Sequence, residues 1–360
     1  MNCFPFYTII TATAAASTLS YASLPMAETV SCLHYAFSQQ ESTALLNEAD
    51  DFIDMLNDGR QDRQADAIFH AIGGNSAELA TLRNSRNSLG TLSDKVERTD
   101  IHGEAASRGV AMRLYRPKDS AGKQIPLLVY LHGGGWTIGS INSCASFCDE
   151  LAASGNVMVL AVDYSLAPEN NYPKGLFDCV SAVEYAFAKA KEWGSSPESV
   201  SIGGDSSGGN LALATCLYLQ DDSSFNHTIK SLLLFYPVVK AYNDKSDSWK
   251  KYSRGYALDS RLMEAFNKAY IAEGDCHDPV VSPADATDDQ LRKLPPMLII
   301  SAERDILCDQ GKEFTSRVKN LGNNVERIEF PGAVHLFITV KGQPTAFNKA
   351  VALSGKFLKE

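Results

Sequence analysis

The chain has 360 residues, of which 44% are hydrophobic and 21% charged, and its formal net charge at pH 7 is −10. This length and apolar content are enough for one large sheet domain with a smaller companion. The acidic balance argues against nucleic acid and anionic membrane surfaces as partners, because both carry negative charge themselves.

The N-terminal 27 residues carry no charged side chain, and Phe4–Ala16 is moderately apolar. Small residues at Ser20–Ala22 and Pro25–Ala27 suit cleavage, so residues 1–27 resemble a secretory signal peptide, although the usual basic start is missing. Ser and Thr interrupt the stretch throughout, which argues against a membrane span. We therefore expect a secreted or periplasmic protein. The alternative is a cytoplasmic protein in which this stretch is a loose arm.

The strand signals begin at Ile125–Leu131, an almost unbroken apolar run typical of a parallel strand buried on both faces. An alternation of strand and helix then follows at Val157–Val162 (strand), Tyr172–Trp193 (helix), Val200–Ile202 (strand) and Leu211–Leu219 (helix). This alternation predicts an α/β fold with a doubly wound parallel sheet, in which functional sites lie at the carboxyl ends of the strands.

A glycine run, His132-Gly133-Gly134-Gly135-Trp136, follows directly on the run Ile125–Leu131. Three consecutive glycines allow backbone N–H groups to converge on one point, where they can hold an oxyanion. The alternative interpretation is a flexible connecting turn.

A Gly-x-Ser-x-Gly pentad, Gly204 to Gly208, lies between the strand at Val200–Ile202 and the helix that follows it. A serine on such a strand–turn–helix corner is held exposed, beside backbone N–H groups, as a nucleophile requires. The pentad alone is a weak signal, and its position at this corner makes Ser206 a candidate nucleophile.

Three segments in this order resemble the hormone-sensitive-lipase branch of the α/β-hydrolases, which are esterases and lipases: His132–Trp136, Asp163–Glu169 and Gly204–Gly209. The resemblance covers roughly residues 95–358. It implies a mostly parallel, doubly wound, eight-stranded sheet flanked by helices, a helical cap over the acyl site, and a Ser–Asp–His triad.

Three residues depart from the family's usual pattern. Ser165 stands where the family usually has Arg, Ser207 where it has Ala, and Leu336 where it has Gly. The first two changes do not touch the reacting atoms, so they bear on local packing. The third is expected to change how its loop closes.

The triad acid must follow the serine in this fold. A strand is predicted at Pro296–Ile300, and the resemblance places the acid at Asp305, in the loop after it. Glu303 and Asp309 are the competing carboxylates. Asp309 is expected to open the next helix, where unpaired N–H groups stabilise a carboxylate.

The triad histidine is predicted at His335, in the loop after a last strand at Val325–Phe330. Seven histidines occur in the chain, and only His335 follows Asp305. His132 is expected to orient the glycine run through hydrogen bonds rather than to act as a second base.

The resemblance implies acyl transfer through a covalent intermediate, with Ser206 as nucleophile, His335 as base and Asp305 as its carboxylate partner. No metal or organic cofactor is required. The oxyanion is expected to meet backbone N–H groups of Gly133, Gly134, Gly135 and Ser207, chiefly the last three.

Two segments lie outside the sheet pattern, and the resemblance assigns them to the cap: residues 28–94, with helical patterns at Ala44–Met55 and Ala65–Ile72, and residues 241–284. The catalytic domain then comprises residues 95–240 and 285–360. The second cap segment is predicted to form a helix that either packs into the core or contacts substrate. Its near-helical stripe consists of Tyr252, Tyr256, Leu262, Phe266 and Tyr270.

The leading hypothesis is a serine carboxylesterase that acts on small-molecule esters with short to medium acyl chains. An amidase or deacetylase, and a true lipase acting on long chains, would use the same triad. A catalytically silent ligand receptor on this scaffold is the third alternative. The presence of His335 argues against it, because such receptors lose the triad histidine.

Overall fold

The computed structural model describes residues 37–56, 58–102 and 109–360. The proposed signal segment, residues 1–27, lies outside the described residues, so its cleavage and the export of the protein stay predictions. Within the described residues, no helix has the length and apolar character needed to cross a bilayer.

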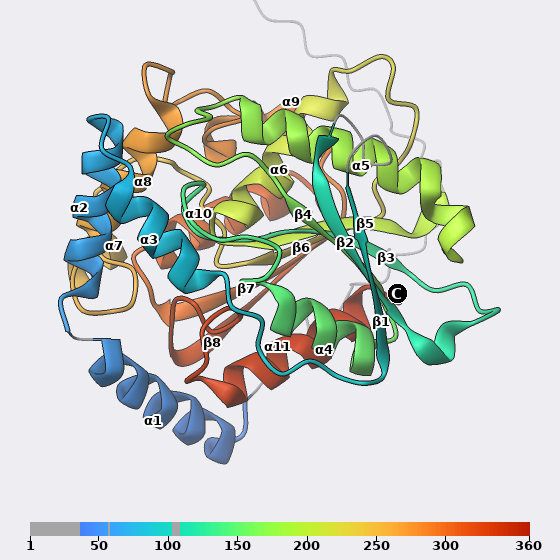
Figure 1. Ribbon diagram of the computed structural model, residues 1–360, viewed down its shortest axis with the longest axis horizontal. Coiled ribbons are helices and arrows are strands. Elements are labelled where there is room, and N and C mark those ends of the chain that lie inside the picture. Colours follow the sequence, from blue (N-terminus) through green and yellow to red (C-terminus); the bar gives the residue numbers. More distant parts are fainter. Residues whose placement is uncertain (1–36, 57, 103–108) are drawn as a thin grey trace, which may run out of the picture. The chain divides into compact units, whose positions relative to one another are not determined.

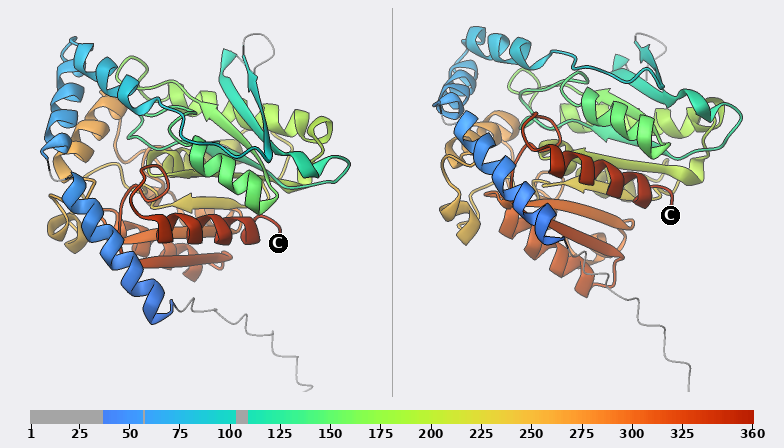
Figure 2. Two further views of the ribbon diagram at one scale, coloured as in Figure 1. Left: turned by 60° about the horizontal axis from the view of Figure 1, so that its bottom comes forward. Right: turned by 90° about the horizontal axis from the view of Figure 1, so that it is seen from below.

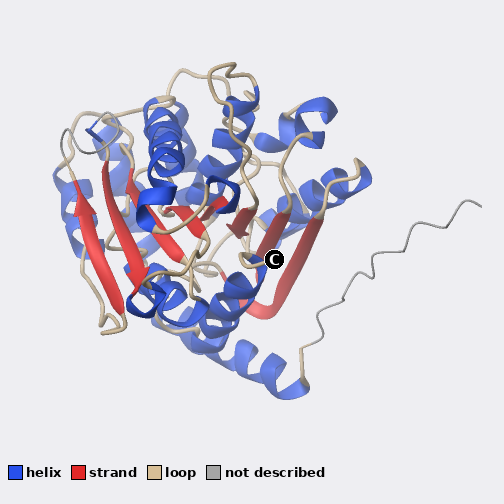
Figure 3. Ribbon diagram, turned by 90° about the vertical axis from the view of Figure 1, so that its right-hand side faces the viewer, coloured by secondary structure: helices blue, strands red, loops and turns tan. Residues whose placement is uncertain are grey.

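An eight-stranded sheet forms the centre of the described chain, in the order β1-β2-β4-β3-β5-β6-β7-β8 (Figures 1 and 3). Pairing is parallel from β4 to β8, and the two pairings made by β2 are antiparallel. The predicted mostly parallel, doubly wound sheet is confirmed. Its strands are β1 (Val96–Ile101), β2 (Ala111–Pro117), β3 (Leu127–Leu131), β4 (Met158–Asp163), β5 (Val200–Asp205), β6 (Leu232–Phe235), β7 (Met297–Arg304) and β8 (Val325–Val334).

Helices cover both faces of this sheet (Figure 1). In β3, Leu127 and Val129 pack into one core and Leu128 and Tyr130 into the other, because successive strand residues point to opposite faces. The first core lies under α5, α6 and α10, and the second under α4 and α11. These helices are α4 (Ala145–Gly155), α5 (Lys174–Trp193), α6 (Ser207–Gln220), α10 (Cys308–Asn320) and α11 (Pro344–Phe357). Burial on both faces explains the unbroken apolar runs in the sequence.

The remaining helices lie outside the alternating strand–helix pattern. They are α1 (Gln39–Leu56), α2 (Arg60–Ile72), α3 (Ala77–Arg86), α7 (Asp247–Lys251), α8 (Ser260–Ile271) and α9 (Asp288–Arg292). Short 3-10 helices in the described chain are η3 (Lys118–Ser120), η4 (Pro197–Ser199) and η5 (Pro283–Asp285).

The two segments that the sequence places in a cap contact each other through α2 and α8. Arg261 reaches from α8 to Asp66 on α2, with 2.6 Å between Nη2 and Oδ1. Helix α3 packs against α2, whereas α1 lies against β8 and α11 (Figure 2). The domain boundaries themselves stay a prediction.

The prediction of one helix along the aromatic stripe is wrong for its first half, which contains Tyr252 and Tyr256. Only the part within α8 is helical, and Tyr252 and Tyr256 lie in the turns before it. Gly255 has a φ of 83°, which no α-helix contains, and its N–H donates to Asp259 Oδ1 at 2.7 Å. This turn separates α7 from α8, so the near-helical spacing of the aromatic residues is not produced by one continuous helix.

Candidate active site

The three residues predicted to form the triad each stand directly after a strand. Ser206 follows β5, Asp305 follows β7 and His335 follows β8. Parallel strands bring their carboxyl ends to the same edge of the sheet, so residues far apart in the chain converge there.

Hydrogen bonds join these three side chains in series. His335 Nε2 lies 3.0 Å from Ser206 Oγ, and His335 Nδ1 lies 2.6 Å from Asp305 Oδ2. A carboxylate can only accept, so Nδ1 donates to Asp305 and Nε2 is left to accept the Ser206 hydroxyl proton. His335 and Asp305 are each 1% exposed and Ser206 is 7% exposed. Bulk water is therefore largely excluded from the series.

Further contacts hold the acid and the base in this orientation. Asp305 Oδ1 accepts a hydrogen bond from the Leu307 N–H at 3.0 Å, which leaves Oδ2 for the imidazole. The ring of Tyr236 packs on the imidazole of His335, with 4.2 Å between ring centroids. No motif in the sequence marks Tyr236 as a support for the histidine.

The backbone at Ser206 turns as a nucleophile corner requires. Ser206 has φ 55° and ψ −118°, an uncommon conformation for a residue with a side chain, and the helix α6 begins at the next residue. Strand β3 passes very close to this corner, since a Cβ atom on Gly208 would lie 1.9 Å from the Leu131 carbonyl oxygen. Glycine at position 208 is therefore a steric necessity.

The prediction that the Gly133 N–H helps to bind the oxyanion is wrong. Its N–H donates to Asp205 Oδ1 at 2.9 Å, so it is not free to receive the oxyanion. The N–H groups of Gly134, Gly135 and Ser207 donate no hydrogen bond within the described part of the chain. These three backbone groups remain as candidates for stabilising negative charge beside Ser206.

Asp205, which directly precedes the nucleophile and was not predicted as a site residue, supports the glycine loop. It is 1% exposed and accepts hydrogen bonds from the Gly133 N–H and the Tyr130 hydroxyl, each at 2.9 Å. Burial raises the pKa of its carboxyl above the ordinary value. The signal available in the sequence was a carboxylate at the end of a buried strand, where it must find donors.

We expect Asp205→Ala to lower kcat roughly 10- to 100-fold. The Gly133 N–H would lose its acceptor, and an unpaired buried donor costs about 1–3 kcal/mol, which shifts the glycine loop. Asp205→Asn keeps an acceptor oxygen and should stay within about tenfold of the wild type. The measurement is kcat for p-nitrophenyl butyrate, with thermal unfolding in parallel. An asparagine variant as impaired as the alanine variant would contradict this role of the acceptor oxygen.

His132 is fully buried, and its ring stacks on Tyr164 with 4.3 Å between centroids. Its Nδ1 lies 2.8 Å from the Gly133 carbonyl oxygen. A carbonyl can only accept, so Nδ1 carries a proton, and burial holds the pKa of His132 below its ordinary value. The His132 ring thus contacts the glycine loop, and it makes no hydrogen bond to Ser206, Asp305 or His335.

The competing carboxylates lie elsewhere. Glu303 Oε2 accepts from the Gly332 N–H at 2.6 Å, and Asp309 Oδ2 accepts from the Ser248 N–H at 2.7 Å. Asp309 lies in the first turn of α10, as predicted. Neither carboxylate is hydrogen-bonded to His335.

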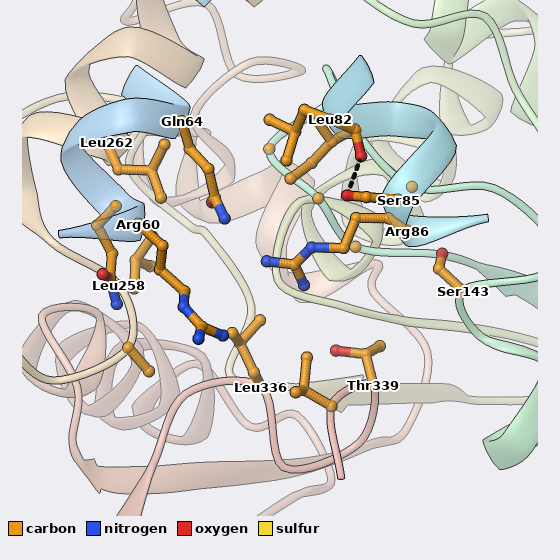
Figure 4. Close-up of a pocket in the computed structure, with 18 of the residues that line it drawn as sticks. Arg60, Gln64, Leu82, Ser85, Arg86, Ser143, Leu258, Leu262, Leu336 and Thr339 are labelled. Carbon is orange, nitrogen blue, oxygen red and sulfur yellow. Dashed lines mark hydrogen bonds between the residues drawn. The ribbon is translucent and has the colours of Figure 1, made fainter. Parts of the chain in front are cut away.

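Ser206 and His335 line a cavity of about 1120 Å³. Figure 4 shows other side chains of its wall. Its apolar lining includes Leu258, Leu262, Phe266 and Leu336. Its polar lining comes mainly from α2, the end of α3 and the loop before α4, and includes Arg60, Gln61, Gln64, Ser85, Arg86 and Ser143. Apolar and polar side chains therefore stand side by side in the cavity wall, with Arg60 near Leu258 and Leu82 near Arg86 (Figure 4).

The residues of the aromatic stripe have two different roles, substrate contact and core packing. Phe266 lines the cavity, and its ring lies so close to Gly135 that a Cβ atom there would be 2.1 Å from Cγ. Tyr270 instead stacks on Trp136 in the core, with centroids 4.5 Å apart and planes 6° apart. Leu262 and Phe266 of the stripe thus face the substrate space, whereas Tyr270 packs on the loop that carries the glycines.

The three departures from the family pattern have different consequences. Ser165 donates its N–H to Asp178 Oδ2 at 2.9 Å, away from the triad. Ser207 Oγ is buried without a hydrogen-bond partner among the described residues. Leu336 has a φ of 75°, which favours glycine, and its side chain lines the same cavity as Ser206 and His335; Figure 4 shows Leu336 in the cavity wall.

Comparison with known proteins gives a family match to the α/β-hydrolase fold over residues 128–339. The arylesterase of Saccharolobus solfataricus is 34% identical over 65% of this chain and 74% of its own length. The ethyl acetate hydrolase of Pseudomonas putida is 32% identical over 63% of this chain and 71% of its own length. The solved structure of a hyperthermophilic esterase from Pyrobaculum calidifontis superimposes with a TM-score of 0.69 and 28% identity, and the match covers 81% of this chain and 96% of that one. The chain belongs to the α/β-hydrolase fold family, within its hormone-sensitive-lipase-like branch, and is a carboxylesterase.

Proposed function

We propose that this carboxylesterase works through an acyl-enzyme on Ser206, with His335 as general base and Asp305 as the carboxylate that orients the imidazole. The supporting observation is the hydrogen-bonded series from Ser206 Oγ through both nitrogens of His335 to Asp305. At its Ser206 end lie the N–H groups of Gly134, Gly135 and Ser207, which donate to no acceptor among the described residues. A nucleophile, an oriented base and free donors are the parts that acyl transfer needs.

In the first half-reaction, His335 Nε2 takes the Ser206 proton while Oγ bonds to the ester carbonyl carbon, and the carbonyl electrons move onto its oxygen. That oxygen meets the N–H groups of Gly134, Gly135 and Ser207; removing one such donor in other enzymes costs roughly 3–4 kcal/mol. The tetrahedral intermediate then expels the alcohol, which takes the proton from Nε2.

In the second half-reaction, a water molecule gives its proton to His335 Nε2 and attacks the acyl carbon. The Ser206 ester bond breaks, Oγ recovers the proton and the carboxylic acid leaves. Asp305 stabilises the imidazolium that forms in each half-reaction and keeps the Nδ1 proton in place.

Short to medium acyl chains are the proposed substrates. The apolar side chains that line the cavity stand among polar ones, which include Arg60, Gln64 and Arg86. A long alkyl chain would have to cover these polar groups and remove water from them, which is unfavourable. A relative named for hydrolysis of ethyl acetate, a short acyl ester, adds support.

A series of p-nitrophenyl esters from acetate to palmitate tests this proposal. We expect kcat/KM to be highest at chains of up to about eight carbons, and an acyl adduct on Ser206 in intact-protein mass spectra under rapid quench. A maximum at palmitate would make the enzyme a lipase. Faster cleavage of matching anilides would make it an amidase.

Leu336 narrows the substrate space in this proposal. We expect Leu336→Gly and Leu336→Ala each to raise kcat/KM for p-nitrophenyl octanoate relative to butyrate by roughly tenfold, because both remove an apolar side chain from the cavity. Glycine adopts the φ of 75° at Leu336 freely, so the glycine variant should be more stable than the alanine variant by about 1 kcal/mol. Kinetics and thermal unfolding check both effects. An unchanged octanoate-to-butyrate ratio of kcat/KM in both variants would show that the Leu336 side chain does not contact the acyl chain.

A further inference from the structure

An unpaired cation projects into the substrate cavity from the end of α3. Arg86 lines the cavity, and Figure 4 shows its guanidinium directed into the open space, across from Arg60. Within the described residues, Arg86 makes neither an ion pair nor a hydrogen bond. Burial and the nearby guanidinium of Arg60 hold the pKa of Arg86 below its ordinary value. An arginine nevertheless stays charged at neutral pH, so its five N–H donors are left without an acceptor.

The acidic residues that line the cavity are all engaged elsewhere. Asp58 holds Arg60, with Nε to Oδ1 at 3.0 Å and Nη2 to Oδ2 at 3.1 Å, and also contacts Arg63. The other three are Asp66, which pairs with Arg261, Glu78, which pairs with His70, and Asp205, which binds the glycine loop. No lining carboxylate is therefore left to neutralise Arg86.

A second lining cation, Lys341, is exposed and has no acidic partner among the described residues. Arg86 and Lys341 are therefore two lining cations with no acidic partner among the described residues, in a chain whose formal net charge is −10. A local cationic site in an acidic protein concentrates anionic ligands where the field lines are focused.

The position of Arg86 is fixed by its own helix. Arg83, one turn earlier on α3, donates from Nη1 and Nη2 to the two carboxylate oxygens of Glu169, each at 2.8 Å. Its Nε also donates to the Thr137 carbonyl oxygen at 2.8 Å, in the segment that follows the glycine run. Residues three apart on a helix lie on the same side, so the anchor at Arg83 holds Arg86 toward the catalytic edge.

We propose that Arg86 binds a carboxylate carried by the substrate, so that the preferred substrates are esters with an anionic group remote from the scissile bond. This inference rests on the proposed function, because it places the reacting carbonyl at Ser206. Guanidinium groups match carboxylate geometry with two parallel hydrogen bonds, and a charge-assisted pair in a partly buried site is among the stronger polar contacts.

The test compares kcat/KM for monoethyl esters of diacids, from succinate to suberate, with kcat/KM for neutral ethyl esters of the same chain length. We expect the wild type to favour the anionic ester at one chain length, and Arg86→Met to lower the anionic-to-neutral ratio there roughly 10- to 100-fold. Arg86→Lys should keep part of the ratio, because it retains charge but not the planar fork. O-acetylated hydroxy acids, compared with acetates of neutral alcohols, test whether the carboxylate belongs to the alcohol instead. Loss of either preference in Arg86→Met supports the inference.

Arg254→Met is the matched control, because Arg254 pairs with Asp62 outside the cavity and is 78% exposed on its side chain. This variant should keep the wild-type ratio. Raising KCl from about 0.05 to 1 M should lower the ratio in the wild type and leave it unchanged in Arg86→Met, since salt screens the charge pair.

The inference is overturned when the wild type prefers the neutral ester in both series, the diacid monoesters and the O-acetylated hydroxy acids, or when Arg86→Met keeps the wild-type ratios. It is also overturned when Arg86→Met slows both ester classes equally, because Arg86 would then only support the end of α3. Failure of the proposed function looks different. In that case Ser206→Ala would hydrolyse neutral ethyl esters as fast as the wild type, whatever the state of Arg86.

Discussion

Replacing Ser206 with alanine is expected to lower kcat for p-nitrophenyl butyrate by roughly 10⁴- to 10⁶-fold. The variant loses the only atom that can form the acyl-enzyme, and the remaining triad residues have no substitute nucleophile. The fold should persist, because the hydrogen bond that Ser206 Oγ makes within the described residues is to His335. Alanine would have to adopt the same backbone conformation as serine, so the free energy of unfolding should change by no more than about 1 kcal/mol.

The matched control is Ser154→Ala, which removes an exposed hydroxyl on α4 that donates to the Glu150 carbonyl oxygen. Activity and stability of this control should equal those of the wild type. If Ser206→Ala retained more than about a tenth of the wild-type kcat, the assignment of the nucleophile would be wrong.

Asp305→Asn is expected to lower kcat by roughly 10⁴-fold while leaving KM nearly unchanged. The asparagine oxygen can still accept from the Leu307 N–H, but its NH₂ group then faces His335 Nδ1. Two donors cannot share this contact, so the imidazole proton moves to Nε2. An Nε2 that carries a proton cannot take the one on Ser206.

Glu303→Gln is the control for this second variant, because Glu303 is a competing carboxylate two residues away. A glutamine oxygen can still accept from the Gly332 N–H, so kcat should stay within about threefold of the wild type. Steady-state kinetics on purified, folded proteins check both variants. If Asp305→Asn were active and Glu303→Gln inactive, Glu303 rather than Asp305 would be the triad carboxylate.

The strands and the convergence of the triad residues were predictable because they follow from strong local signals. The apolar run at Ile125–Leu131 is long enough to identify β3, and the chain order required by the fold leaves His335 as the only histidine after Asp305. Strands β7 and β8, which directly precede Asp305 and His335, each continue beyond the predicted end, to Arg304 and to Val334. The local patterns therefore identify strands better than their ends.

Features that depend on distant contacts were not predictable. Helix α3 was missed because Leu79 is its one buried residue, so it shows almost no apolar periodicity. The Gly133 N–H is not free for the oxyanion because it donates to Asp205, which is 72 residues away in the chain. Likewise, no pattern in the sequence distinguishes Arg86 from other basic residues, and its lack of a partner in the cavity is known only from the positions of the lining carboxylates.

The central claim is that Ser206 becomes nucleophilic through its contact with His335. Labelling with a fluorophosphonate probe tests it most directly, because the probe reacts only with an activated serine. We predict one adduct per chain, located on Ser206 by peptide mass mapping, with loss of esterase activity at the same rate and no adduct in His335→Ala. An adduct on another residue, or full esterase activity in protein that carries the adduct, would contradict the account.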